Sequence, residues 1–338
     1  MIYGLARSAL FALDPEHAHQ VTLGMLRAAP ALASAFCAAV PDHPVTLAGI
    51  TFRNRVGLAA GLDKNAHCLP AWDRFGFGFV EVGTVTPRPQ PGNPRPRMFR
   101  LPAQQALINR LGFNNLGVDH LIAQVRRHPI KATLGINIGK NADTALERAA
   151  EDYVTCLQKV YPHAGYVTVN ISSPNTLNLR DLQHGEALAG LLRRLERERA
   201  RLDQDLGRRV PLFLKIAPDN TAEGFAETAT TARTLGVDGL IVSNTTVSRP
   251  GLENSAVAAE AGGLSGAPLR PLALSALKAV RTAVGADFPV IGVGGIVRGA
   301  DARERREAGA DLVQIYTGFI FAGPGLVGDC RRALSGRA

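Results

Sequence analysis

Short apolar runs alternate with amphipathic stretches along most of the chain. Eight runs have strand length and are almost continuously hydrophobic, which is typical of parallel strands buried on both faces. They are residues 56–60, 79–82, 134–138, 166–171, 212–216, 239–242, 289–293 and 312–316. Between runs, residues 142–160, 186–206, 221–235 and 268–284 place apolar side chains three and four positions apart, which predicts helices. The pattern therefore predicts a β–α unit repeated eight times.

Two α/β folds could hold this alternation, a closed barrel or an open doubly wound sheet. Eight repeats in about 280 residues match the size of a (β/α)8 TIM barrel. Polar residues favour the barrel more strongly, because nearly every apolar run is followed by a group able to do chemistry. These groups are Lys64, Thr84, Asn137, Asn170, Ser173, Lys215, Asn244, Gly295 and Thr317. We expect them to converge, since active sites of such barrels lie at the carboxyl ends of the strands.

The first forty residues have a different pattern. Apolar positions follow helical spacing up to Leu13, and a second amphipathic pattern runs from Ala18 to Leu26. Asp14 and Pro15 form a helix-start signal between them. We predict a small N-terminal helical hairpin at 1–40 and a catalytic barrel at 41–338. The hairpin either caps the barrel bottom, or forms an apolar surface or tunnel mouth that meets lipid or a hydrophobic ligand.

Composition excludes several classes of protein. With 46% hydrophobic and 20% charged residues, the 338-residue chain is too apolar to be disordered. No apolar stretch reaches the roughly eighteen residues of a membrane span, and the N-terminus lacks a signal-peptide pattern, so we expect a cytoplasmic protein. The four cysteines have neither disulfide nor metal-ligand spacing, which predicts reduced thiols and no metal site. They are Cys37, Cys68, Cys156 and Cys330.

The formal net charge of +9 indicates attraction to anions, which could be nucleic acid, an acidic membrane surface or a small substrate. Part of the charge is local. The segment 85–110, here called the basic segment, contains five arginines and no acidic residue. It is either a solvated loop or a guide for anionic substrate or lipid headgroups. A second basic run, 193–209, is interleaved with acids and predicts an exposed, salt-bridged helix face.

Two glycine-rich segments near the carboxyl end predict a phosphate site. Residues 291–296 directly follow a strand, and residues 262–266 precede a helix that opens near Pro268. Glycines let backbone N–H groups approach a phosphate, and the helix dipole attracts it. With Thr317 and Gly318, they match the phosphate pocket found after the seventh and eighth strands of many barrels. Val297 occupies the third glycine position of a G-x-G-x-x-G pattern, which disfavours a Rossmann dinucleotide unit.

Neutral amides and two lysines are the other groups expected at the barrel mouth. The amides offer donor and acceptor edges to a planar, imide-bearing ring, and Lys64 and Lys215 offer positive charge to a carboxylate or a developing anion. The amides are Asn109, Asn114, Asn137, Asn170, Asn175 and Asn244. Ser173 is the candidate for proton transfer, although the sequence shows no His or Asp partner nearby. The absence of a G-x-S-x-G elbow or an ordered triad disfavours acyl-transfer hydrolysis.

Four motifs resemble those of dihydroorotate dehydrogenases. They are AGLDK at 60–64, NRLGFNN at 109–115, NISSPNT at 170–176 and IGVGGI at 291–296, and the resemblance covers essentially the whole chain in order. Residues 10–19, LFALDPEHAH, resemble the helical extension of the quinone-dependent class 2. Soluble members that use fumarate or NAD lack this extension and carry a catalytic cysteine where this chain has Ser173. Two features therefore imply the same class.

The resemblance implies oxidation of (S)-dihydroorotate to orotate in de novo pyrimidine biosynthesis, with flavin mononucleotide (FMN) as hydride acceptor and a membrane quinone as terminal acceptor. Ser173 would remove the C5 proton. The implied FMN contacts are Ala60, Gly61, Leu62, Asp63, Lys64, Thr84, Asn137, Asn170, Lys215, Ser243, Gly266, Gly295, Tyr316 and Thr317. The implied substrate contacts are Lys64, Asn109, Arg110, Leu111, Gly112, Phe113, Asn170, Asn175, Asn244 and Thr245. The family commonly has threonine at the position of Ser243, so the hydroxyl is kept.

By the same resemblance, the N-terminal helices would contact the cytoplasmic side of the inner cell membrane and admit quinone between them. Two other functions remain open. A flavin barrel that acts on RNA, such as a tRNA-dihydrouridine synthase, would use the positive charge. The sequence shows no RNA-binding module, however, so a nucleic-acid partner is not expected. A non-enzymatic phosphate-binding or membrane-interaction protein would leave the ring of polar strand ends unexplained.

Overall fold

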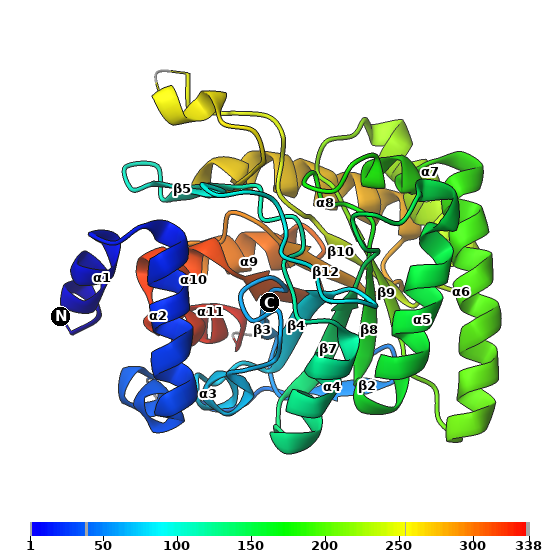
Figure 1. Cartoon of the computed structure of the whole chain (residues 1–338), viewed down its shortest axis with the longest axis horizontal. Coiled ribbons are helices and arrows are strands. Elements are labelled where there is room, and N and C mark those ends of the chain that lie inside the picture. The colour runs from blue at the N-terminus through cyan, green and yellow to red at the C-terminus, as the bar shows by residue number, and fades with distance from the viewer. Residues whose placement is uncertain (1, 38–39, 254, 336–338) are drawn as a thin grey trace.

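The computed structural model describes residues 2–37, 40–253 and 255–335, and Figure 1 shows a barrel of strands surrounded by helices. Eight parallel strands close the barrel, and their order in the chain is also their order around it. They are β3 (Val56–Leu58), β4 (Phe79–Val85), β7 (Thr133–Ile138), β8 (Tyr166–Asn170), β9 (Leu212–Ile216), β10 (Gly239–Val242), β12 (Val290–Val293) and β13 (Leu312–Ile315). Each predicted apolar run overlaps one of these strands, although β4 and β7 extend beyond their runs. The predicted (β/α)8 barrel is confirmed.

Helices follow the strands on the outside of the barrel. They are α3 (Leu69–Arg74), α4 (Val118–Arg127), α5 (Ala149–Val160), α6 (Gly185–Leu206), α7 (Ala222–Thr234), α8 (Arg270–Val284), α9 (Gly299–Glu307), α10 (Thr317–Ala322) and α11 (Gly325–Ser335). The four predicted helices are all present, but α5 begins at Ala149 and not at residue 142. Asp152 of α5 accepts hydrogen bonds from the Asn141 N–H at 2.8 Å and the Thr144 hydroxyl at 2.7 Å. These bonds hold the preceding residues in a loop.

A two-stranded hairpin, β1 (Val45–Leu47) and β2 (Ile50–Phe52), closes the amino-terminal end of the barrel. The Phe52 ring is buried 5.3 Å from the Phe79 ring and 6.4 Å from the Tyr166 ring, measured between centroids. Phe79 and Tyr166 are the first residues of β4 and β8, so this aromatic cluster lies at the barrel bottom. The alternative in which the N-terminal helices cap the bottom is therefore wrong.

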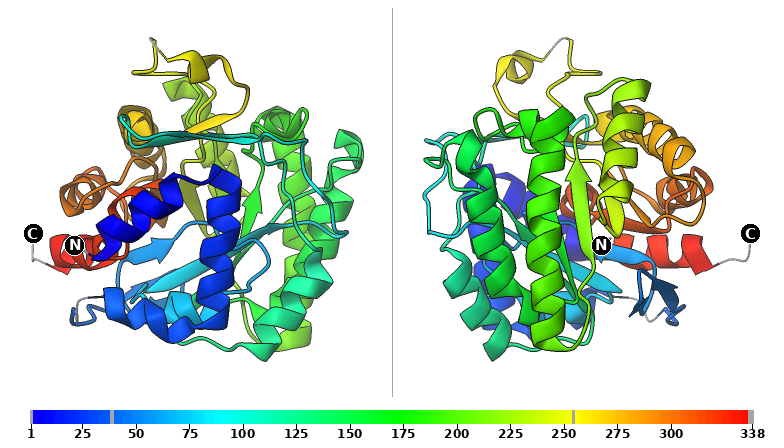
Figure 2. Two further views of the ribbon diagram at one scale, coloured as in Figure 1. Left: turned by 60° about the vertical axis from the view of Figure 1, so that its left-hand side comes forward. Right: turned by 90° about the vertical axis from the view of Figure 1, so that its right-hand side faces the viewer.

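Three short strands form a separate antiparallel sheet that the sequence did not predict. They are β5 (Met98–Leu101), β6 (Ala106–Asn109) and β11 (Gly263–Gly266), in the order β11–β6–β5. Figure 2 shows this sheet lying across the end of the barrel opposite the β1–β2 hairpin. Much of the basic segment is thus a hairpin and not a loop, and the glycine-rich segment 262–266 is mostly strand β11.

The N-terminal segment folds into α1 (Ile2–Phe11), α2 (Pro15–Ala28) and a short 3-10 helix (Pro30–Phe36). Asp14 caps α2 as predicted, because its carboxylate accepts hydrogen bonds at 3.0 Å from the backbone N–H groups of Glu16 and His17. The Tyr3 hydroxyl and the Arg7 guanidinium donate to backbone carbonyls of α10, at Ile320 and Phe321. The helices therefore lie against the side of the barrel's carboxyl end.

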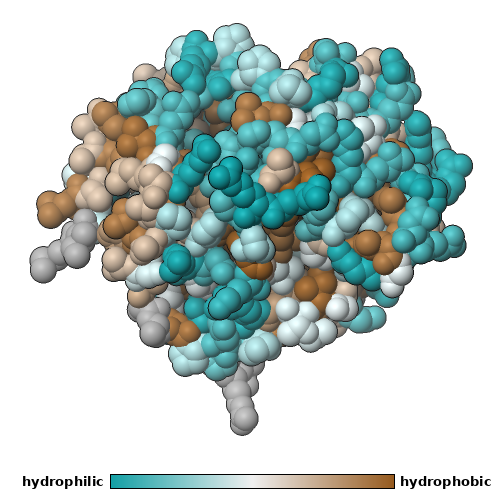
Figure 3. Space-filling view, turned by 60° about the horizontal axis from the view of Figure 1, so that its bottom comes forward, coloured by the Kyte–Doolittle hydropathy of each residue, from teal (hydrophilic) through white to brown (hydrophobic). Residues whose placement is uncertain are grey.

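Large hydrophobic side chains are exposed on these N-terminal elements. Leu5 is 77% exposed, and Leu13, Met25 and Leu32 are 38%, 54% and 46% exposed. Figure 3 shows apolar surface gathered at the left of the view, where the N-terminal helices lie. Within the described residues, no helix combines the length and the hydropathy that a bilayer crossing requires.

Candidate active site

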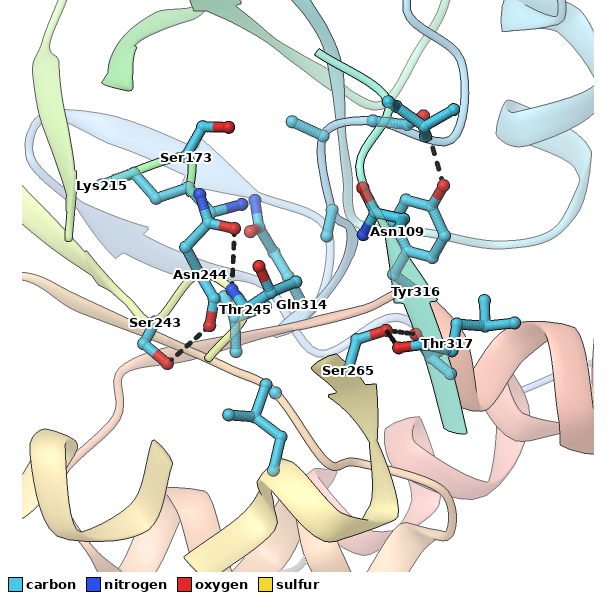
Figure 4. A pocket seen from close by; sticks show the side chains of 18 of the residues that line it. Asn109, Ser173, Lys215, Ser243, Asn244, Thr245, Ser265, Gln314, Tyr316 and Thr317 are labelled. Atoms are coloured by element: carbon cyan, nitrogen blue, oxygen red, sulfur yellow. Dashed lines mark hydrogen bonds between the residues drawn. The ribbon is translucent and has the colours of Figure 1, made fainter. Parts of the chain in front are cut away.

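A cavity lies at the carboxyl ends of the barrel strands, below β6 and β11 (Figure 4). We call it the barrel cavity. It brings together most of the residues that were predicted from the motifs. Those that line it are Ala60, Gly61, Lys64, Thr84, Asn109, Leu111, Gly112, Phe113, Asn170, Ser173, Asn175, Lys215, Ser243, Asn244, Thr245, Gly266, Gly295, Tyr316 and Thr317. The predicted convergence of strand ends is confirmed.

Two predicted contact residues point their side chains elsewhere. Asp63 is buried, and its carboxylate accepts hydrogen bonds from the backbone N–H groups of His67 and Cys68 at 2.8 Å, and from the Trp72 indole at 2.9 Å. It holds the start of α3. Arg110 forms an ion pair with Glu260 at 2.6 Å, outside the cavity lining.

Three further expected residues also lie outside the lining. Asn114 and Asn137 do not line the barrel cavity, although Asn137 is fully buried directly behind it. Leu62 lines a different cavity, described below. A side-chain contact with a ligand in the barrel cavity is not expected from any of the three.

The sequence reasoning missed several lining residues. Ser265 accepts a hydrogen bond from the Thr317 hydroxyl at 2.8 Å, and Gln314 lies on β13 with its side chain inside the barrel. Gln314 is the amide side chain that interrupts the apolar run 312–316, which was a usable signal. Ser265 lies in the glycine-rich segment that was predicted to bind phosphate, but only the glycines of that segment were given a role. Met98 and Leu107 were missed with the sheet that carries them.

A connected set of amides and hydroxyls forms one wall of the cavity. The Asn170 Nδ2 donates to the Thr84 hydroxyl oxygen at 2.8 Å. The Asn170 Oδ1 accepts from the Ser172 hydroxyl at 3.1 Å and from the Asn244 Nδ2 at 3.4 Å. The Asn244 Nδ2 also donates to the Ser172 Oγ at 2.9 Å. Because every group is held by another, this wall presents a fixed pattern of donors and acceptors.

A second amide pair, Asn109 and Asn175, lies on β6 and on the loop after β8. The Asn175 Nδ2 donates to the Asn109 Oδ1 at 3.2 Å. The Asn175 Oδ1 is buried and has no hydrogen-bond partner within the described part of the chain. A buried acceptor without a donor is unfavourable, so this atom is suited to an N–H group of a bound ligand.

Two lysines supply positive charge to the cavity. Burial, together with nearby Arg97, lowers the pKa of Lys64 to about 8, and Glu16 and Asp63 oppose this shift. Burial also lowers the pKa of Lys215 from its usual value, against the effect of Glu81. Neither ammonium group donates a hydrogen bond to another described residue. An anionic ligand would relieve both desolvated charges.

Ser173 lies on the loop after β8 and is only 5% exposed. Its Oγ accepts a hydrogen bond from the Asn175 backbone N–H at 3.2 Å. This donor stabilises negative charge on the oxygen, and no described side chain of His, Asp or Glu hydrogen-bonds to the hydroxyl. In Figure 4, Ser173, Lys215 and Asn244 lie on the same side of the cavity.

The far side of the cavity has the character of an anion pocket. The Thr317 and Ser265 hydroxyls meet there, next to Gly294, Gly295 and Gly266. Gly295 has a φ of 73°, and a Cβ atom would lie 2.5 Å from the Arg270 Cα at the start of α8. The glycine is therefore needed for close packing of the loop on the helix, which opens the backbone toward the cavity.

A second cavity, the helix cavity, lies between the N-terminal helices and the barrel. Its lining is mostly apolar and includes Ala6, Leu10, Phe11, Ala18, His19, Leu23, Leu26, Leu62, Phe75, Arg100, Phe319 and Ile320. Three residues, Met98, Leu107 and Tyr316, line both cavities. Burial lowers the pKa of His19 to about 4, and nearby Lys64 adds to that shift, so the His19 ring in this cavity is neutral at physiological pH.

The described part of the chain contains neither a metal-ligand cluster nor a disulfide bond. Within the described ranges, no group of three or more His, Cys, Asp or Glu side chains lies close enough to hold a metal ion. The described cysteines are all unpaired, and Cys68, Cys156 and Cys330 are buried.

The fold and the site together define an oxidoreductase of the β/α-barrel class. The family model described as dihydroorotate dehydrogenase matches residues 44–337, so the chain belongs to the dihydroorotate dehydrogenase family. This family is flavin-dependent.

Relatives match over the full length. A protein of Paraburkholderia phymatum named dihydroorotate dehydrogenase (quinone) is 54% identical, and the alignment covers 100% of this chain and 98% of the relative. One of Azotobacter vinelandii with the same name is 52% identical over 99% of this chain and 97% of the relative. Among solved structures, the ligand-free enzyme of Eimeria tenella has a TM-score of 0.85 and 39% identity, covering 95% of this chain and 94% of that one.

Proposed function

We propose that this chain oxidises dihydroorotate to orotate in the barrel cavity, with FMN as its bound cofactor, and delivers the electrons to a quinone in the helix cavity. The observation that carries the proposal is the pair of adjoining cavities of opposite character. One is lined by amides, hydroxyls and two lysines, and the other is mostly apolar. The full-length relatives named dihydroorotate dehydrogenase (quinone) support the same assignment.

The barrel cavity fits FMN at both ends. Thr317, Ser265 and the backbone near Gly295 would hold the phosphate, because hydroxyl and backbone N–H donors gather there. Lys215 and the amide wall would face the ring system. The bound flavin would supply hydride acceptance, which no amino-acid side chain offers.

The chain's own residues would do three things for dihydroorotate. Lys64 would neutralise its carboxylate, and Asn109 and Asn175 would bind its ring N–H and C=O groups. Ser173 would remove the C5 proton, and the Asn175 N–H that holds its Oγ would stabilise the charge that develops there. Burial of Ser173 and Lys215 keeps bulk water away from the reacting atoms.

The helix cavity suits the reoxidation step. A quinone is apolar except for its carbonyl groups, which need hydrogen-bond donors, and His19 and Arg100 are polar groups in this otherwise apolar lining. The exposed hydrophobic side chains around α1 and α2 surround the same region. We propose that they rest in the interface of the inner cell membrane on its cytoplasmic side, so that quinone enters from the lipid.

Electron-acceptor specificity tests the proposal. Purified protein should be yellow, lose its flavin colour when dihydroorotate is added without oxygen, and regain it on addition of a short-chain ubiquinone. Recovery with fumarate or NAD and not with quinone would contradict the class assignment. Colourless protein that cannot be reconstituted with FMN would contradict the cofactor.

A further inference from the structure

A buried carboxylate lies beneath the amide wall of the barrel cavity. Glu81 is in the middle of β4, is 0% exposed, and forms no ion pair within the described residues. Burying a carboxylate is costly unless its oxygens are well hydrogen-bonded. Its Oε1 accepts from the Asn137 Nδ2 at 2.8 Å. Its Oε2 accepts from the Tyr166 hydroxyl at 3.0 Å and from the Gln314 Nε2 at 2.7 Å.

The carboxylate determines the direction of the next amide. Both Glu81 oxygens accept hydrogen bonds from their neighbours, so Asn137 turns its nitrogen toward Glu81. The Asn137 Oδ1 then faces the cavity side, where it accepts from the Thr84 hydroxyl at 2.5 Å and from the Asn170 Nδ2 at 3.2 Å. Asn137 is therefore a link in a chain of hydrogen bonds that starts at Glu81.

The hydrogen bonds of Asn137 also determine the orientation of the amides that line the cavity. With its nitrogen used by Thr84 and Asn137, Asn170 turns its Oδ1 toward Ser172 and Asn244. The Asn244 Nδ2 donates to the Asn170 Oδ1, and the Asn244 Oδ1 accepts from the Thr245 backbone N–H at 2.7 Å. A network of amides and hydroxyls alone can often run in either direction, because each amide can rotate by half a turn. An acceptor held at the position of the Glu81 Oε1 removes that freedom.

We infer that Glu81 is a positioning residue that fixes, through Asn137, which edges Asn170 and Asn244 turn toward the ligand. The inference rests on the proposed binding of flavin and dihydroorotate in the barrel cavity. Glu81 is not itself a lining residue of the cavity, although its Oε2 accepts a hydrogen bond from Gln314, which is one.

Three variants separate the effect of hydrogen-bond direction from the effects of the Glu81 charge and of side-chain packing. Glu81→Met removes the acceptor and keeps the length of the side chain. Glu81→Gln removes the charge but keeps one acceptor for Asn137, and its new amide nitrogen can bond to the Gln314 Oε1, which has no partner in the described structure. Tyr166→Phe removes a donor to the other Glu81 oxygen and leaves the Asn137 bond intact.

Orotate affinity of the flavin-loaded variants is the readout, measured by the change in flavin absorbance as orotate is added. We expect Glu81→Met to raise the dissociation constant about tenfold, the effect of one misdirected hydrogen bond. Glu81→Gln and Tyr166→Phe should stay within about threefold of wild type. A purely structural role would lower the melting temperature of all three variants without this selective pattern.

Wild-type affinity in Glu81→Met would overturn the inference, as would equal losses in Glu81→Met and Glu81→Gln. Should Glu81→Met yield no folded flavoprotein, Asn137→Leu cuts the same chain one residue later and carries the same expected tenfold loss. Unchanged orotate affinity in Asn137→Leu would then be decisive against the inference. Failure of the wild-type protein to bind flavin or orotate would instead count against the proposed function.

Discussion

Glu16 of α2 and Arg97, which lies just before β5, form a buried ion pair with two hydrogen bonds. The Arg97 Nη2 and Nε donate to the two Glu16 oxygens at 2.8 and 3.0 Å. The Arg97 Nη1 also donates to the carbonyl oxygens of Pro91 and Asn93 at 2.7 Å. The Asn93 Nδ2 in turn donates to the Asn175 carbonyl at 3.3 Å. One chain of contacts thus joins the N-terminal helices to the loop that carries Ser173.

This pair gives a role to part of the basic segment. Arg95 shares Glu16 with Arg97, and Arg100 donates to the carbonyl oxygens of Phe11 and Leu13. Three of its arginines therefore hold the N-terminal helices in place. These guanidinium groups are engaged with the protein, so the positive charge of the segment is not by itself evidence of an RNA-binding surface.

Glu16→Gln should loosen the N-terminal helices. Burial raises the pKa of the Glu16 carboxyl, but the hydrogen bonds and charges of Arg97 and Arg95 together lower it below its usual value. The ion pair therefore stabilises the folded protein at a pH above the pKa that this carboxyl has in the unfolded chain. This stabilisation is lost as the pH falls through the lower pKa of the carboxyl in the folded protein. Removing one partner of a buried pair costs on the order of 3 kcal/mol. We expect faster proteolysis of residues 2–37 and slower flavin reoxidation by quinone.

Arg88→Ala is the matched control for that variant. Arg88 and Asp143 form an ion pair at 2.6 Å, but their side chains are 58% and 74% exposed. An exposed pair contributes at most about 1 kcal/mol. Equal proteolysis rates in the two variants would show that the Glu16–Arg97 pair does not anchor the helices.

Ser173→Ala should keep the flavin and slow its reduction by dihydroorotate at least about 100-fold, the range expected when an acid–base group is lost. Stopped-flow absorbance measures this step directly. Ser173→Cys should recover part of the rate, since a thiolate is also a base. A reduction rate in Ser173→Ala equal to that of wild type would remove Ser173 from the proposed role.

Orotate affinity should fall as the pH rises through about 8, the value to which burial lowers the pKa of Lys64. Below this pH the ammonium is charged and attracts the orotate carboxylate, and above it the neutral amine does not. In Lys64→Arg the guanidinium stays protonated, so the affinity should be nearly flat up to about pH 10. Titrations of orotate across this range provide the measurement, and a flat wild-type profile would contradict the assignment of Lys64 to the carboxylate.

Phe52→Ala should destabilise the barrel without changing the chemistry. Phe52 is fully buried against Phe79, and loss of such a ring costs about 3–5 kcal/mol. Flavin reduction by the folded protein should remain normal, because the β1–β2 hairpin lies at the opposite end from the barrel cavity. Thr46→Ala in the same hairpin changes an exposed residue and should cost less than about 0.5 kcal/mol. Urea titration gives both values.

Membrane contact can be tested on the exposed apolar residues. The double variant with Leu5→Glu and Leu32→Glu should float less with vesicles of phosphatidylethanolamine and phosphatidylglycerol, and should reduce long-chain quinone in those vesicles more slowly. Leu116→Glu alters a residue that is 48% exposed on the loop before α4 and should have no such effect. Equal flotation of the double variant and wild type would argue against docking through these helices.

Much of the fold followed from local patterns, because buried parallel strands such as Leu212–Ile216 are continuous apolar runs and Asp14–Pro15 is a local helix start. The small sheet did not, because β11 pairs with β6 across about 150 residues and half of β11 is glycine. The roles of Asp63 and Asn137 were also beyond the sequence. Both sit in or near recognisable motifs, but only the spatial arrangement shows that one holds a helix start and the other a buried carboxylate.

Met98, Leu107 and Tyr316 face both cavities, so these three side chains lie between the sites proposed for the two reactants. A water-soluble acid and a lipid-soluble oxidant can each arrive from the phase in which they dissolve. A ligand bound in the barrel cavity leaves the helix cavity free, and the reverse also holds. Two inhibitors, one shaped like orotate and one like a quinone, should therefore be able to bind the same molecule together, and a resistance mutation at a residue that lines a single cavity should leave sensitivity to the other inhibitor.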